Sequence, residues 1–131
     1  MSEKRIDIRW RDLDGLGHVN QAVYPTYGEE TVDAWFREAL GLGPGEIWNY
    51  VVVRMTTNFH SELRLTDGHV VGTTHLVRVG TSSVTVRVEL RAGSDGRLAA
   101  DTECIFACWD PERRSSRPLT DAERAQLEAM A

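Results

Sequence analysis

One helical segment followed by four strand-like segments constrains the fold of this chain most. From Pro25 to Leu40 the apolar side chains recur at helical spacing, with charged residues between them. Residues 51–63, 70–79, 83–91 and 98–109 alternate between apolar and polar side chains, as half-buried strands do. A first strand is indicated by Ile6, Ile8 and Trp10. Because a single helix covers one face of a sheet, we expect an α+β fold with a five-stranded antiparallel sheet wrapped around one long central helix.

Several local signals refine this expectation. Pro25 suits the first position of the helix, and Gly41 or Gly43 suits its end. Gly28 inside the helix predicts a close packing contact, because glycine costs about 1 kcal/mol there relative to alanine. Turn residues at 66–68, 80–81 and 93–96 predict consecutive hairpins.

The end of the chain predicts a second, shorter helix. A capping box, Thr120-Asp121-Ala122-Glu123, starts a segment that we expect to be helical over about 120–130. No internal repeat or linker divides the sequence. We therefore interpret residues 1–131 as one domain, with a core over about residues 5–110.

Composition and cysteine content bear on the class of protein. Apolar residues make up 41% and charged residues 27%, which is typical of globular proteins. No run of 18 apolar residues predicts a membrane span, and residues 1–5 do not resemble a secretion signal. Cys104 and Cys108 on one strand would lie about 13 Å apart, too far for a disulfide. Two free thiols favour a cytoplasmic location.

The charge balance argues against a nucleic-acid partner. Fifteen basic and 20 acidic residues give a net charge of −5, so no basic field is available for a phosphate backbone. Fourteen of the 15 basic residues are arginine, and single arginines can still hold phosphates in bidentate fashion. An anionic carrier such as coenzyme A (CoA) therefore remains compatible with the sequence.

The segment from Arg11 to Tyr27, RDLDGLGHVNQAVYPTY, carries the strongest functional signal. It resembles the signature of hotdog-fold acyl-CoA thioesterases of the 4-hydroxybenzoyl-CoA thioesterase type. In that family an aspartate after the first strand precedes a G-H-V-N-N turn and the central helix. The resemblance spans about residues 5–110 and implies the hotdog fold, which has the order of elements expected above.

The resemblance also implies catalytic residues. Plant acyl-carrier-protein thioesterases have a related turn, and a glutamate follows in their next strand. Asp14, His18 and Asn20 match these motifs, and Glu62 stands at the place of the strand glutamate. Leu16 replaces the catalytic asparagine of the plant enzymes, so that role is not carried over.

Thioester hydrolysis needs a carboxylate as nucleophile or general base, and donors for the oxyanion. Asp14 precedes a helix whose first N–H groups, at Val23, Tyr24 and Thr26, lie at the positive end of the dipole. The alternative is that Asp14 only binds the backbone of its own turn. His18 is a candidate acid or base, or a loop-holding residue.

Other residues compete for roles or add to the site. Asn20 could fix the turn, Asp12 could pair with Arg9 or Arg11, and Glu30 could replace Asp14. Tyr24 and Tyr27 are expected in the core and along the substrate pocket. Arg87 and Arg91, on a wet strand face, are candidates for binding CoA phosphates, unless acidic neighbours such as Glu89 neutralise them. The next candidates are Arg113 and Arg114.

These observations predict an acyl-CoA or acyl-carrier-protein thioesterase that needs neither cofactor nor metal ion. Histidines 60, 69 and 75 are expected to be ordinary polar residues of strands. A sheet with one helix leaves a face or an edge uncovered, which favours a homodimer or homotetramer. The alternatives are a hotdog hydratase or dehydratase and a non-catalytic acyl-binding protein.

Overall fold

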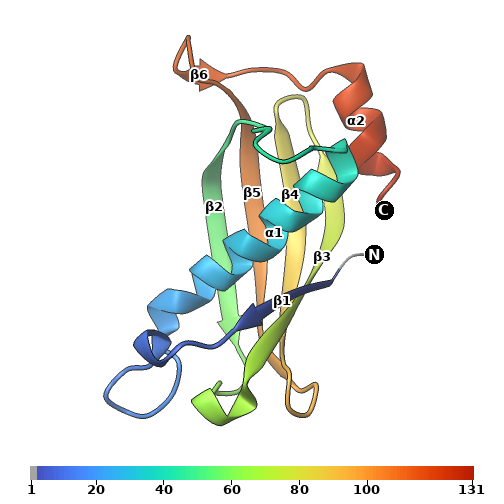
Figure 1. Ribbon diagram of the computed structural model, residues 1–131. Coiled ribbons are helices and arrows are strands. Elements are labelled where there is room, and N and C mark those ends of the chain that lie inside the picture. Colours follow the sequence, from blue (N-terminus) through green and yellow to red (C-terminus); the bar gives the residue numbers. More distant parts are fainter. Residues whose placement is uncertain (1–2) are drawn as a thin grey trace.

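A curled antiparallel sheet lies against one long helix in this computed structural model, which describes residues 3–131 (Figure 1). Met1 and Ser2, part of the segment judged not to be a secretion signal, lie outside the described residues. The helices are α1 (Tyr24–Leu40) and α2 (Asp121–Glu128). The strands are β1 (Glu3–Asp7), β2 (Tyr50–Phe59), β3 (His69–Val79), β4 (Ser83–Ala92), β5 (Leu98–Asp110) and β6 (Ser115–Ser116). Short 3-10 turns occur at Trp10–Asp12, Gln21–Val23 and Leu65–Asp67.

The strands run in the order β1-β3-β4-β5-β2, and β6 adds a short pair to the end of β5. Strands β3, β4 and β5 form the expected hairpins, but a hairpin at residues 66–68 is wrong, because β2 pairs with β5. From Phe59 to His69 the chain instead crosses the lower end of the sheet in Figure 1. The 3-10 turn at Leu65–Asp67 and Gly68, whose φ is +81°, lead the chain into β3 beside β1. Turn residues occur both in hairpins and in a crossover of this kind, so the residues at 66–68 could not distinguish the two connections.

The first strand is shorter than expected. Ile6 and Ile8 are buried, but Trp10 lies in a 3-10 turn with 80% of its surface exposed. The Asp12 carboxylate accepts the Arg9 N–H at 3.0 Å, which turns the chain away from the sheet before Trp10. The prediction that the first strand continues to Trp10 is therefore wrong.

Helix α1 crosses the sheet diagonally and buries one stripe of side chains (Figure 1). Gly41, at φ +63°, ends this helix as predicted. The helix meets the sheet closely at Gly72, where a Cβ atom would collide with Thr31. At Gly28, which is buried, a Cβ atom would have no neighbour within 4 Å among the described residues outside its own helix. The close contact predicted at Gly28 is thus wrong for this chain.

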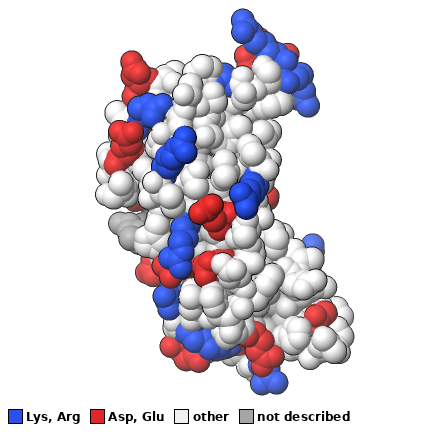
Figure 2. Space-filling model, turned by 180° about the vertical axis from the view of Figure 1, so that it is seen from behind, with Lys and Arg blue, Asp and Glu red and all other residues white. Residues whose placement is uncertain are grey.

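The outer face of the sheet carries interleaved basic and acidic side chains (Figure 2). At its edge, β2 exposes Val52 and Val53 at a bulge in its pairing with β5. Cys104 and Cys108 are free, as predicted, and both are buried. No helix in residues 3–131 is long and apolar enough to span a membrane.

Helix α2 begins with the predicted capping box. Thr120 accepts the Glu123 N–H at 3.1 Å, and Glu123 accepts the Thr120 N–H at 2.8 Å. The Glu123 carboxylate also accepts hydrogen bonds from Trp48 at 2.6 Å and from Arg117 at 2.8 and 2.9 Å. These contacts fasten α2 to the segments around β2 and β6.

Candidate active site

A tight turn before α1 holds the residues of the sequence motif. Leu13 and Val19 form an isolated antiparallel bridge, and inside it the Asp14 N–H donates to the His18 carbonyl at 3.0 Å. Gly17 adopts φ +84°, which explains a glycine at this point of the turn. Because the bridge fixes both ends of the turn, Asp14 and His18 lie side by side.

Asp14 serves its own turn and also faces outward. Its Oδ1 atom accepts the Leu16 N–H at 2.9 Å, so the alternative of a turn-binding aspartate is part of its role. Its Oδ2 atom lies 3.6 Å from Nδ1 of His18. The Asp14 side chain keeps 24% of its surface exposed and the His18 side chain 33%, so both can reach a substrate.

A cavity of about 670 Å³ opens beside this turn. Asp14, His18, Asn20, Tyr24 and Glu62, all candidates from the sequence, line it together. Six more residues complete the lining: Leu16, Val19, Gln21, Phe59, His60 and Ser61. No local pattern in the sequence pointed to Phe59, His60 and Ser61, because only the crossover from β2 brings them beside the turn.

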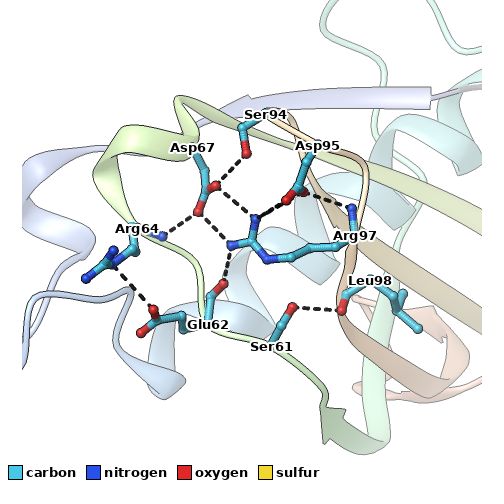
Figure 3. Close-up of polar contacts among 8 residues, drawn as sticks. All are labelled: Ser61, Glu62, Arg64, Asp67, Ser94, Asp95, Arg97 and Leu98. Carbon is cyan, nitrogen blue, oxygen red and sulfur yellow. Dashed lines mark hydrogen bonds and ion pairs between the residues drawn. The ribbon is translucent and has the colours of Figure 1, made fainter.

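The crossover supplies the second wall of the cavity. The Leu63 carbonyl accepts the Val19 N–H at 2.8 Å, which joins the crossover to the turn. The Glu62 carboxylate lies 3.4 Å from the Arg64 guanidinium, and the Glu62 carbonyl accepts an N–H from Arg97 at 2.6 Å (Figure 3). Glu62 thereby lines the same cavity as Asp14, although 48 positions separate them in the sequence.

The start of α1 differs from the sequence expectation. The Val23 N–H donates to the Asn20 carbonyl at 2.9 Å, and the Tyr24 N–H donates to the Gln21 carbonyl. The sequence predicted that these two N–H groups are free to bind an oxyanion. That prediction is wrong, because both donate to carbonyls of their own turn. Asn20 caps the turn through Oδ1, which accepts the Ala22 N–H at 2.9 Å.

The two tyrosines of α1 have different surroundings. Tyr24 lines the cavity, with its ring 5.1 Å from that of Phe59. Burial raises the pKa of Tyr24. Tyr27 is fully buried and donates a 2.7 Å hydrogen bond to Asp12. Burial, together with that bond, raises the pKa of Tyr27 well above its usual range. Tyr27, Val23 and the exposed Thr26 are not among the residues that line the cavity.

Asp12 pairs with Arg9, one of the two partners expected for it. Asp12 is 2% exposed, and its carboxylate lies 3.3 Å from the Arg9 guanidinium. Burial raises the pKa of Asp12, but hydrogen bonds from Arg9 and Tyr27 outweigh burial and hold it below the usual range. Glu30 lies in a separate groove between β1 and α1, away from Asp14.

The arginines predicted for phosphate binding lie on the outer face of the sheet. Arg87 lies 3.7 Å from Glu89 and 3.8 Å from Asp101, and Arg91 lies 3.2 Å from Glu89. Acidic neighbours thus balance both charges. Figure 2 shows a separate basic cluster on a projecting arm, where Arg113 and Arg114 are exposed in the β5–β6 connection.

The histidines predicted to be ordinary polar residues include two with carboxylate partners. His60 binds Asp101 through Nε2, and His75 lies 3.0 Å from Glu89. Among residues 3–131, no three histidine, cysteine, aspartate or glutamate side chains gather in a group able to hold a metal ion.

The comparison with protein families identifies the fold family. Residues 8–127 match the model of the thioesterase-like superfamily. The chain belongs to this superfamily. Its curled sheet and single long helix form the hotdog fold, as the resemblance implied, and family membership supports thioester hydrolysis as the general activity. A search of curated proteins finds no match.

Solved structures agree with this assignment. A thioesterase from Thermus thermophilus, complexed with coenzyme A and Zn, is 29% identical, with a TM-score of 0.81 over 98% of this chain and 92% of that chain. The PA2801 protein from Pseudomonas aeruginosa is 30% identical, with a TM-score of 0.82 and coverage of 98% and 97%. The TT1821 protein from Thermus thermophilus is 21% identical and covers the whole of both chains at a TM-score of 0.86, which concerns the fold alone.

Proposed function

We propose that this protein hydrolyses acyl-CoA thioesters to a free acid and CoA, with Asp14 as the main catalytic carboxylate. The observation that supports this most is that the turn residues and Glu62 share one cavity. Two separate segments of the chain thereby supply polar groups around an open space. The similar thioesterase that binds coenzyme A supports CoA as the carrier, with an acyl carrier protein as the alternative.

Asp14 can act through Oδ2, because Oδ1 is occupied by the Leu16 N–H. As a base, it takes a proton from a water whose oxygen attacks the thioester carbon. The tetrahedral intermediate then expels the CoA thiolate, which is protonated on release. As a nucleophile, it forms a mixed anhydride and expels the thiolate, and water then cleaves the anhydride. After a single turnover in ¹⁸O-water, label in Asp14 identifies the anhydride route, since only water attack on the Asp14 carbonyl of the anhydride places ¹⁸O there.

Asn20 and His18 provide the remaining polar groups. The Ala22 N–H holds Oδ1 of Asn20, which leaves the amide N–H groups of Asn20 as donors for the oxyanion beside the cavity. His18, next to Asp14, orients the carboxylate or transfers a proton. Glu62, which lines the same cavity, is assigned a supporting role.

Binding of the CoA phosphates by Arg87 and Arg91 stays a prediction. If they bind the nucleotide, Arg91→Ala raises KM and leaves kcat unchanged, and the effect shrinks with added salt. An unchanged KM at low salt in both Arg87→Ala and Arg91→Ala would mean that the nucleotide binds elsewhere on the protein. The exposed Arg113 and Arg114 are then the next to test.

A homodimer or homotetramer in the cytoplasm completes the proposal. The open edge of β2 and its exposed Val52 and Val53 suit contact with a second copy. Two buried free thiols, Cys104 and Cys108, suit a reducing compartment. Neither a nucleic acid nor a membrane is proposed as a partner.

A thiol-release assay over short, long and aromatic acyl-CoAs tests the proposed activity. Release of CoA from at least one class supports it. Hydration of an enoyl-CoA without thiol release would instead favour a hydratase, for which Asp14 and His18 are the available pair. Binding without any turnover would favour a non-catalytic acyl-binding protein.

A further inference from the structure

Arg97, which directly precedes β5, is the centre of a polar cluster that includes Glu62 and Asp67 of the crossover (Figure 3). Its guanidinium donates to Asp67 at 3.0 and 3.1 Å and to Asp95 at 3.0 and 3.1 Å. The same group donates to the Glu62 carbonyl at 2.6 Å. The Arg97 side chain therefore links two segments, the crossover that contains Glu62 and the β4–β5 turn.

The acceptor at the centre of this cluster is buried. The Asp67 side chain is 8% exposed and also accepts the Arg64 N–H at 2.7 Å and the Ser94 hydroxyl at 2.6 Å. These bonds, first that of Arg97, lower the pKa of Asp67 to about 2. A buried carboxylate that loses its cation is costly, so Arg97 and Asp67 depend on each other.

The crossover held by Arg97 contacts the active-site turn directly. Leu63 follows Glu62, and its carbonyl accepts the Val19 N–H one residue after His18. Glu62 lines the cavity, and the bond from Arg97 reaches the Glu62 carbonyl. A displacement of this carbonyl would move both the Glu62 carboxylate and the support of the turn.

We propose that Arg97 is a positioning residue of the active site, which fixes the Glu62–Leu63 segment against the turn of Asp14 and His18. This inference rests on the proposed thioesterase function. Because the guanidinium binds three acceptors in a planar fork, lysine cannot replace all of its contacts. Misplacement of catalytic groups by about 1 Å can lower a rate by about 100-fold.

The test compares Arg97→Ala and Arg97→Lys with Arg117→Ala. Arg117 is a matched control, because it also forms a double hydrogen bond with a carboxylate, that of Glu123 in α2. Its side chain is 32% exposed, against 31% for Arg97. We expect kcat to fall by about 10-fold or more in Arg97→Ala, less in Arg97→Lys, and not in Arg117→Ala. Guanidinium at millimolar concentration should restore part of kcat in Arg97→Ala, since the vacated space is open to solvent.

Hydrogen exchange separates this inference from the proposed function. Exchange at the Val19 amide should be at least about 10-fold faster in Arg97→Ala and Arg97→Lys than in Arg117→Ala, whether or not the protein hydrolyses a thioester. Absence of activity in the unmodified protein with fast Val19 exchange in the variants would overturn only the proposed function. Equal kcat in Arg97→Lys and Arg117→Ala, with unchanged Val19 exchange in Arg97→Lys, would overturn the positioning role. This comparison does not need Arg97→Ala, so it remains decisive if that variant does not fold.

Discussion

The carboxylate of Glu123 is predicted to stabilise the fold in a pH-dependent way, and Glu123→Gln tests this. Its side chain is 15% exposed, and hydrogen bonds from Arg117, followed by those from Thr120 and Trp48, lower its pKa from 4.5 to about 2. At about 1.4 kcal/mol per pKa unit, this corresponds to about 3 kcal/mol. We expect roughly 2–3 kcal/mol at pH 7, because water partly screens the pair.

The lowered pKa of Glu123 determines the direction in which the stability changes with pH. The folded state binds this proton more weakly than the unfolded state, so the stabilisation is complete above pH 4.5 and is lost as pH falls towards 2. The single amide oxygen of Glu123→Gln can replace only one of the two carboxylate oxygens, which accept the Thr120 N–H and the Trp48 N–H separately. The substitution therefore removes the charge, which gives the pH-dependent part of the loss, and one acceptor, which adds a part that does not change with pH. The difference in unfolding free energy between the two proteins should therefore shrink between pH 5 and pH 2.

Urea titrations at several pH values, at one protein concentration, measure this difference. Glu128→Gln on the same helix is the control. Its side chain is 56% exposed and lies 3.9 Å from Arg124, so its loss should cost at most about 0.5 kcal/mol. A loss in Glu123→Gln that is equal at all pH values, or as small as that of the control, would refute the reasoning.

Three further predictions follow from packing, edges and charge. Gly72→Ala should lower the free energy of unfolding, measured in urea, by at least about 1 kcal/mol, because the added methyl group collides with Thr31. Gly28→Ala, where no such contact exists within residues 3–131, should be neutral or stabilising. Equal effects of the two substitutions would contradict the packing at Gly72. Sedimentation at micromolar concentration should give at least twice 14.7 kDa, and a stable monomer would contradict the proposed contact at the β2 edge. Succinyl-CoA should have a lower kcat/KM than butyryl-CoA, because its free carboxylate would meet Asp14 and Glu62 in a cavity that no lysine or arginine of the described residues lines. Equal kcat/KM values would count against this cavity as the site of the acyl group.

Local patterns in the sequence predicted most of the elements. The helix expected over 25–40 occupies Tyr24–Leu40, and the strands expected over 70–79, 83–91 and 98–109 match β3, β4 and β5 within one residue. The strand expected over 51–63 ends at Phe59. Its alternation continues to the buried Leu63, but the chain there lies outside the sheet, and the Leu63 carbonyl accepts the Val19 N–H instead of a strand partner.

Contacts between distant segments explain what the sequence did not predict. The pairing of β2 with β5 joins strands that are not consecutive, and no local signal specifies it. Arg97 binds acceptors in two different segments, so its position becomes visible only in the fold. Glu62 was found through the resemblance alone, and its place beside Asp14 depends on the crossover.

The role of Asp14 is tested most directly by the kcat of Asp14→Asn on the best acyl-CoA substrate, with Glu30→Gln as a control carboxylate outside the cavity. The asparagine oxygen can still accept the Leu16 N–H, so the turn should persist. We expect kcat to fall by about 100-fold or more in Asp14→Asn, and to stay unchanged in Glu30→Gln. Full activity of a folded Asp14→Asn protein would contradict the assignment of Asp14 as the catalytic carboxylate.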